Sequence, residues 1–235
     1  MRDHIERFTF VVLTLAAVAI AATLVRREFF PRTQVASVAA EAKAPEFLPG
    51  WTDLLDGGVF VGDREAPVKV VEFMDLECPY CRKFNASVRA LRQKYGSKVA
   101  VIVVHYPLDM HRFAHPAARA AECANDHGRF ESFFNLVYEK QDSLGLKSWA
   151  SYASEAGVRD TAAFTRCASA TAAVPRIDTG LTLAKKIAAD ATPTVIVNGW
   201  RYFMPPNDAE LERVVATLLA GKTPFDSVRR VGRSD

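Results

Sequence analysis

The hydrophobic pattern of the chain changes its period several times. Short apolar runs at 59–61 and 68–74 indicate two strands, and the second leads directly into 79–95, where apolar residues recur every three or four positions as in an amphipathic helix. A β-branched run at 98–106 follows. This part of the sequence therefore predicts a strand, a helix and a further strand in close succession.

The next segment, 112–190, is rich in alanine and keeps the helical spacing through several glycine-containing breaks, which predicts consecutive helices. Two strand-like runs then meet at Asn198-Gly199, a dipeptide that favours a hairpin, and a last helix is expected at about 208–220. The fold class expected from this order is α/β, with a helical segment inserted between the strands.

The N-terminus carries a different pattern. Residues 8–25 form an apolar run without a charge, bounded by Arg7 and Arg26, and such a run can span a bilayer. We expect an uncleaved transmembrane helix within 1–27. A cleaved signal peptide is the alternative, although the first Ala-x-Ala pattern after the run begins at Ala40, well past its end. A buried globular helix is disfavoured because the run has no polar face.

The rest of the chain divides into a linker, a domain and a tail. Residues 28–50 contain alanine and proline with weak periodicity and are interpreted as a linker. One soluble domain is expected at 51–225, with its helical insertion at about 112–190, followed by a tail at 226–235. Arginines on both sides of the apolar run leave its orientation undecided.

Composition narrows the function classes. The 235 residues include 30 basic and 27 acidic side chains, a net charge of +3, with no long run of either sign, so nucleic-acid binding is not expected. The hydrophobic fraction of 49% is enough for a substantial core. Four cysteines are too few for a small scaffold built on disulfides, which leaves redox chemistry or metal binding.

The close pair Cys78 and Cys81 lies where a strand gives way to a helix. Its first sulfur should lie near unpaired backbone N–H groups and the positive end of the helix dipole, both of which favour a thiolate. We assign Cys78 as the nucleophile of thiol–disulfide exchange and Cys81 as the resolving thiol. The alternative is half of a zinc site, but no second CxxC completes it, and no metal is expected. The other candidate ligands are His105, His111, His115, Cys123 and His127.

The passage 70–81, the helical insertion and Thr192-Pro193 together resemble the DsbA-like branch of the thioredoxin superfamily, over about residues 46–222. The resemblance implies a thioredoxin-like fold, in which helices flank a central mixed sheet and a helical subdomain is inserted. It also implies protein-disulfide oxidoreductase activity without a cofactor. A cis bond before Pro193, in a loop that faces the sulfurs, is a further implication, whereas X-Pro bonds are usually trans. The substrate-binding residues that it implies are Pro79, Tyr80, Thr192 and Pro193.

Glu72 lies six residues before Cys78, where thioredoxin-like proteins carry a partly buried acid beneath the active-site helix. By resemblance it relays protons to Cys81, and desolvation should raise its proton affinity. The alternative is a solvated glutamate at a strand end. The neighbouring Asp75 and Glu77 are assigned no catalytic role.

Tyr80 stands where DsbA carries a histidine between its cysteines. A neutral side chain cannot lend positive charge to the Cys78 thiolate, so the resemblance implies a weaker oxidant than DsbA. The direction of exchange (oxidation, isomerisation or reduction) depends on the potential of the pair relative to its electron partner and stays open.

Cys123 and Cys167 lie on segments expected to pack as neighbouring helices. Some DsbA-like proteins carry a second bridge, and we expect a structural disulfide between these two cysteines, with two buried free thiols as the alternative. No role is assigned to His105, His111, His115 and His127.

The expected function is thiol:disulfide exchange with cysteine-containing exported proteins, by a single-pass protein of the cell inner membrane whose catalytic domain faces the periplasm or another extracytoplasmic space. That placement follows from the chemistry, because cytosolic thiol buffers would keep Cys123 and Cys167 reduced. A membrane redox partner would recycle the pair. The alternatives are a dedicated reductant for one client, for example in cytochrome c assembly, and a peptide-binding chaperone whose cysteines are only structural.

Overall fold

The computed structural model describes residues 43–225. Within these residues no helix is both long enough and apolar enough to cross a membrane. The transmembrane helix expected at 1–27, the tail at 226–235 and the linker up to Ala42 lie outside the described residues.

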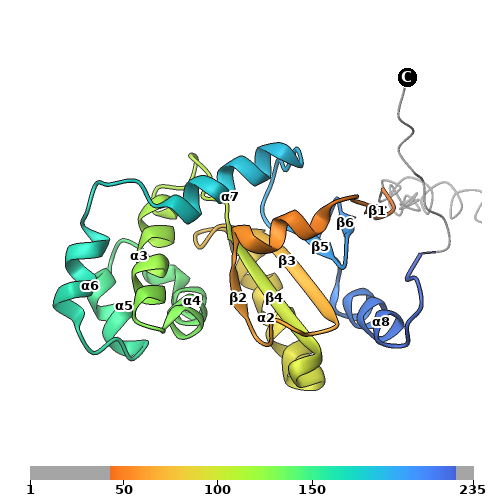
Figure 1. Cartoon of the computed structure of the whole chain (residues 1–235). Coiled ribbons are helices and arrows are strands. Elements are labelled where there is room, and N and C mark those ends of the chain that lie inside the picture. Colours follow the sequence, from red (N-terminus) through yellow and green to blue (C-terminus); the bar gives the residue numbers. More distant parts are fainter. Residues whose placement is uncertain (1–42, 226–235) are drawn as a thin grey trace, which may run out of the picture. The chain divides into compact units, whose positions relative to one another are not determined.

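A six-stranded mixed sheet forms the centre of the domain (Figure 1). Its strands are β1 (Glu46–Phe47), β2 (Val59–Val61), β3 (Val68–Met74), β4 (Val99–His105), β5 (Thr194–Val197) and β6 (Trp200–Tyr202). Their order in the sheet is β1-β6-β5-β3-β4-β2. The central strand β3 pairs in parallel with β4 and antiparallel with β5. The mixed sheet expected from the resemblance is therefore confirmed.

Helices cover the sheet and fill the insertion. They are the 3₁₀ helices η1 (Trp51–Gly57), η2 (Gly96–Lys98) and η3 (Gln141–Ser143) and the α-helices α2 (Pro79–Tyr95), α3 (Ala114–Asp126), α4 (Phe130–Glu139), α5 (Trp149–Glu155), α6 (Thr161–Ala168), α7 (Pro175–Lys186) and α8 (Asp208–Leu219). The side chains of Asp160 and Asn207 cap α6 and α8 by accepting bonds from backbone N–H groups. The consecutive helices predicted at about 112–190 are thus confirmed as α3 to α7.

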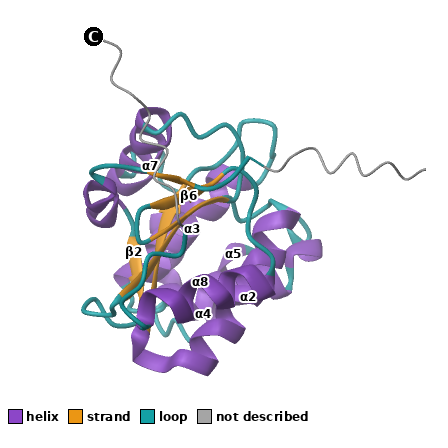
Figure 2. Cartoon of the chain, turned by 90° about the vertical axis from the view of Figure 1, so that its right-hand side faces the viewer, coloured by secondary structure: helices purple, strands orange, loops and turns teal. Residues whose placement is uncertain are grey.

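Alternation along β3 assigns each of its side chains to one face of the sheet. Val71 and Phe73 belong to the core under η1 and α7, whereas Val70 and Met74 belong to the core under α2 and α8. Figure 2 shows α7 on one side of the strands and α2 and α8 on the other. Glu72 has the same parity as Val70 and Met74, so it lies on the face beneath α2.

The sheet begins earlier than the sequence indicates. β1 pairs with β6, with Glu46 opposite Arg201 and Phe47 opposite Trp200, inside the segment 28–50 that is predicted to be a linker. A strand of two residues is too short to show a period, and its place depends on a partner far along the chain. The end of the predicted linker is therefore part of the domain.

His105, to which the sequence assigns no role, belongs to a buried polar cluster. Its Nε2 lies 2.9 Å from Glu122 Oε1 of α3, and Arg176 Nε of α7 donates to Glu122 Oε2 at 3.0 Å. Burial alone would raise the pKa of Glu122, but its bonds to His105 and Arg176 outweigh that effect and the pKa is lowered. The cluster ties α3 and α7 to the end of β4.

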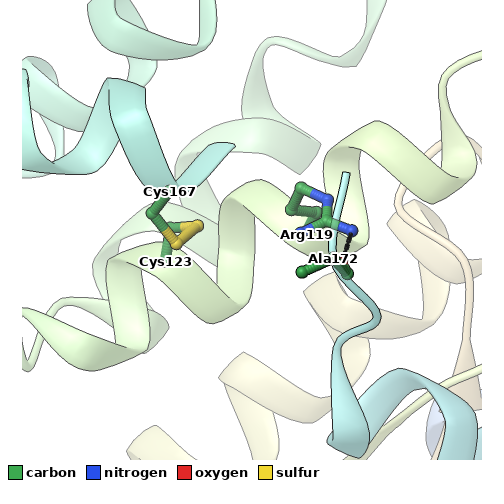
Figure 3. Close-up of a disulfide and its surroundings, with 4 residues drawn as sticks. All are labelled: Arg119, Cys123, Cys167 and Ala172. Carbon is green, nitrogen blue, oxygen red and sulfur yellow. Dashed lines mark hydrogen bonds between the residues drawn. A yellow bond between two sulfur atoms is a disulfide. The ribbon is translucent and has the colours of Figure 1, made fainter. Parts of the chain in front are cut away.

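A disulfide joins Cys123 of α3 to Cys167 of α6, with the Cα atoms 5.9 Å apart and the residues separated by 44 positions in sequence (Figure 3). The expected structural bridge is confirmed, and the alternative of two free thiols is wrong. Nearby, Arg119 of α3 donates a hydrogen bond to Ala172 O at 2.5 Å. The bridge and this bond together fasten α3 to α6 and to the connection that follows α6.

Removing the bridge should weaken the insertion. We expect the Cys123→Ala/Cys167→Ala double variant to lose about 2–4 kcal/mol of unfolding free energy, because the unfolded chain regains the freedom that the closed loop removes. Urea denaturation followed by circular dichroism measures the loss. An unchanged denaturation midpoint would contradict the prediction.

Candidate active site

Cys78 lies at the junction of β3 and α2. In the turn after the strand, Cys78 N donates to Asp75 O at 3.1 Å, and Cys78 is the N-cap residue of the helix. Pro79 is the first helical residue, a position where its missing N–H costs nothing. The backbone N–H groups of Tyr80 and Cys81 therefore reach the Cys78 sulfur, as the sequence predicts.

The two cysteines of the pair are reduced and buried. A hydrogen bond from the Cys81 thiol lowers the pKa of Cys78 to about 5, although burial opposes it; the Thr192 side chain and the first N–H groups of α2 act in the same direction. Burial is the main cause that raises the pKa of Cys81 well above its usual value. At neutral pH the pair therefore combines a thiolate at Cys78 with a thiol at Cys81.

The loop before β5 faces the sulfur of Cys78. The Thr192–Pro193 bond is cis, as the resemblance implies, and the trans alternative is wrong. The Cys78 Sγ atom lies 3.3 Å from Thr192 O and donates to it in its thiol form. Thr192 is thus placed against the reactive sulfur, with Pro193 next to it in the chain.

Glu72 is buried on the central strand, between Val103 of β4 and Val195 of β5. It is 1% exposed, so the alternative of a solvated carboxylate is wrong. Burial, and secondly the negative charge of Cys78, raises the pKa of Glu72 to about 8. Glu72 in turn contributes to the raised pKa of Cys81. Its burial is confirmed, while the proton relay stays a prediction.

The remaining predicted substrate-binding residues, Pro79 and Tyr80, lie on the surface. Tyr80 is 71% exposed and borders a groove of about 450 Å³ between the start of α2 and the loop from β6 to α8. Phe84, Met204 and Pro205 also line it. The lining is mainly apolar, which suits an extended apolar segment of another chain.

Residues without a predicted role hold the turn before Cys78. Gln141, at the start of η3, donates from Nε2 to Leu76 O at 2.8 Å and to Cys78 O at 3.0 Å. Tyr138 OH, on α4, donates to Asp75 O at 3.2 Å. Both residues come from the helical insertion, and no local pattern marks them in the sequence. The insertion therefore shapes the active-site turn.

In the part of the chain that the structure describes, no further ligands lie close enough to Cys78 and Cys81 to complete the alternative zinc site. No group of three or more His, Cys, Asp and Glu side chains within 43–225 is arranged to hold a metal ion. Three of the candidate ligands have other partners: Cys123 is in the disulfide, His105 is bonded to Glu122, and His111 is bonded to Asp75.

Comparison with known proteins identifies the family. A family model described as thioredoxin matches residues 54–217, which include the cysteine pair and the cis-proline loop. The chain belongs to the thioredoxin family. This confirms the superfamily that the sequence resembles.

Two solved structures have the same thioredoxin-family fold. A thioredoxin-like oxidoreductase from Silicibacter pomeroyi is 26% identical with a TM-score of 0.57, over 68% of this chain and 91% of that chain. Oxidised BdbD from Bacillus subtilis is 22% identical with a TM-score of 0.64, over 77% of this chain and 99% of that chain.

A region similar to this thioredoxin-family chain also occurs in a longer protein. The Na(+)/H(+) antiporter NhaA 3 of Salinispora tropica is 36% identical over 160 residues, which are 68% of this chain but 24% of the antiporter. The matched region thus spans about a quarter of the length of the first curated relatives. The match identifies a shared region and not a shared whole protein.

The buried Glu72 should make stability depend on pH. The pKa of Glu72 is raised from 4.5 to about 8 on folding. Its contribution to the free energy of unfolding is therefore fully present below pH 4.5, where the carboxyl is protonated in both states, and is lost as the pH rises through about 8. We expect wild-type protein to lose stability relative to Glu72→Gln across that interval, by at most about 1.4 kcal/mol per pH unit.

Urea denaturation of both proteins in the same redox state, at several pH values in that interval, measures this difference. The glutamine side chain does not titrate, so any constant cost of burying it cancels in the slope. Parallel pH profiles would show that Glu72 is not desolvated.

Proposed function

We propose that this protein is a thiol:disulfide oxidoreductase that exchanges disulfides with cysteine-containing exported proteins. One observation carries the proposal: the Cys78 sulfur, whose pKa is lowered to about 5, lies at the start of α2 and 3.3 Å from Thr192 O, hydrogen-bonded to the Cys81 thiol. A stable thiolate beside a protonated partner thiol is what exchange through a mixed disulfide requires.

In the oxidising direction the pair begins as a disulfide. A client thiolate attacks the Cys78 sulfur; the client–Cys78 bond forms, the Cys78–Cys81 bond breaks, and Cys81 leaves as a thiolate that takes up a proton. A second client thiolate then attacks the client sulfur of the mixed disulfide and releases Cys78 as a thiolate. The client is oxidised by two electrons and the pair is reduced by two.

The lowered pKa of Cys78 favours this direction, because a stable thiolate is a good leaving group and stabilises the reduced pair. Glu72 supplies the proton that Cys81 takes up. Its raised pKa leaves the carboxyl group partly protonated near neutral pH, and it interacts with Cys81. In the reducing direction the same carboxylate accepts the proton as Cys81 ionises to resolve the mixed disulfide.

Clients are extended segments of exported proteins that lie across the cis-proline loop and the groove. The apolar lining beside Tyr80 supports this, because an unfolded segment offers apolar side chains. The protein is held at the outer face of the inner membrane by the helix predicted within 1–27, and a membrane redox partner reoxidises the pair. The disulfide between Cys123 and Cys167 supports an oxidising compartment.

Serine variants test the exchange chemistry. We expect Cys78→Ser to abolish both insulin reduction and the oxidation of a reduced protein, because the remaining sulfur, Cys81, is buried and its pKa is raised, so it cannot form the mixed disulfide. Cys81→Ser should accumulate a mixed disulfide with the client, since nothing resolves it. Non-reducing electrophoresis detects that species.

The Cys123→Ala/Cys167→Ala variant is the control and should retain exchange activity. Full activity of Cys78→Ser in either assay would contradict the proposal, and a wild-type protein that binds peptides but is inactive in both assays would favour a peptide-binding chaperone. The equilibrium of the pair with glutathione gives the direction: a potential near that of thioredoxin would indicate a reductase or isomerase.

The groove can be tested separately from the sulfur chemistry. Met204 is 72% exposed in the groove lining, and Met204→Lys should raise KM for a peptide disulfide by about tenfold while leaving reaction with glutathione disulfide unchanged, because only the peptide is long enough to reach it. Leu146→Lys, at an exposed apolar residue outside the groove lining, is the matched control. Equal effects of the two variants would argue against the groove.

A further inference from the structure

The loop between β4 and α3 is bonded directly to the turn that carries Cys78. Leu108 N donates to Asp75 Oδ2 at 2.9 Å, and Phe113 N donates to Glu77 Oε2 at 2.5 Å. The two acids to which the sequence assigns no role thus hold this loop in place. The residues between Leu108 and Phe113 are therefore held in a fixed position relative to the active-site turn.

The loop carries His111. Its Nδ1–H donates to Asp75 Oδ2 at 2.7 Å, and the other oxygen of Asp75 accepts from Glu77 N at 2.7 Å. Asp75 is fully buried, whereas the His111 side chain is 21% exposed. A buried carboxylate is costly unless it is paired and hydrogen-bonded, so the Asp75 site favours a cation as its partner.

The charges around His111 favour its protonated form. Burial lowers the pKa of His111, but the hydrogen bond to Asp75 and the negative charges of Asp75, Cys78 and Glu77 outweigh it, and the pKa is raised. Asp75 links the two groups, because its side chain accepts from His111 Nδ1 and its backbone O accepts from Cys78 N at 3.1 Å. The interaction between the two charges is mutual: a thiolate that stabilises the imidazolium is itself stabilised by it. Asp109 and Arg112 flank His111 on its own loop.

We propose that His111 is a positioning residue of the redox pair: held by Asp75, its imidazolium stabilises negative charge on the Cys78 sulfur. The residue between the cysteines, Tyr80, is neutral and cannot supply that charge. His111 does so from a loop that lies 33 positions further along the chain than Cys78. Because only the reduced pair carries the thiolate, His111 makes the pair a stronger oxidant. This inference rests on the proposed thiol:disulfide exchange.

The competing explanation is that His111 only tethers its loop to Asp75. A neutral hydrogen-bond donor at position 111 would hold the loop to Asp75 equally well. Substitutions at this position can therefore separate the effect of the positive charge from the effect of the hydrogen bond. His111→Asn keeps an N–H donor close to the position of Nδ1 and removes the charge, and His111→Gln is a second neutral variant if the first does not fold. His111→Lys keeps the charge.

The control variant is His115→Asn. His115 lies four residues further on, is about half exposed and pairs with Asp109 at 3.3 Å. It has no bond to the active-site turn among the hydrogen bonds of the described residues. The substitution therefore repeats the chemical change of His111→Asn away from the sulfur.

The full-length variants are compared by two measurements. One is the ultraviolet absorbance of the Cys78 thiolate as a function of pH, and the other is the equilibrium of the pair with glutathione. We expect His111→Asn to raise the midpoint of thiolate formation by about one pH unit and to make the pair about tenfold less oxidising, a change of about 30 mV. His111→Lys should restore most of both values, and His115→Asn should change neither.

Two outcomes would overturn the proposal. His111→Asn could leave both values as they are in wild type, or His111→Lys could shift them as far as His111→Asn does. The thiolate titration needs no client, so it separates this inference from the proposed function. A titration that depends on His111, in a protein without exchange activity, would refute the function and support the electrostatic role.

Discussion

A thiolate in a buried position can persist only where donors and charges outweigh the loss of hydration. In this protein that condition is met at one turn, between β3 and α2, and parts of the chain far apart in sequence contribute to it. The Cys81 thiol and the first N–H groups of α2 donate to the sulfur. Gln141 and Tyr138 of the insertion bond the backbone carbonyls of the turn and hold its shape, and the loop before β5 brings Thr192 against the sulfur. The sheet and the insertion therefore meet at the same few atoms, and the position of Cys78 depends on both.

The same burial acts differently on three neighbouring acids. It raises the proton affinity of Glu72 and Cys81, which have few compensating donors, while Cys78 keeps enough donors at the helix start for the opposite result. Glu72 and Cys81 therefore favour their neutral forms, whereas Cys78 favours its thiolate beside the cis-proline loop.

The sequence predicts the elements whose signals are local. The period of β3 and α2, the cysteine spacing between them and the Asn-Gly hairpin all lie within short windows, and the register of Glu72 follows from them. The cis bond before Pro193 is predicted from the resemblance alone, and the second disulfide from the resemblance together with the expected packing of two neighbouring helices, since neither has a local signal. β1, Gln141 and Tyr138 could not be predicted, because each owes its role to a partner brought near only by the packing of the whole domain.

The disulfide in the insertion makes this protein a member of the substrate class proposed for it. A newly made chain holds Cys123 and Cys167 as thiols, and α3 and α6 are joined only after two electrons have been removed from them. By the proposed exchange, a mature copy whose Cys78–Cys81 pair is oxidised would accept those electrons. Maturation would then be autocatalytic: the first molecules would depend on another oxidant, and each finished molecule would speed the completion of the next.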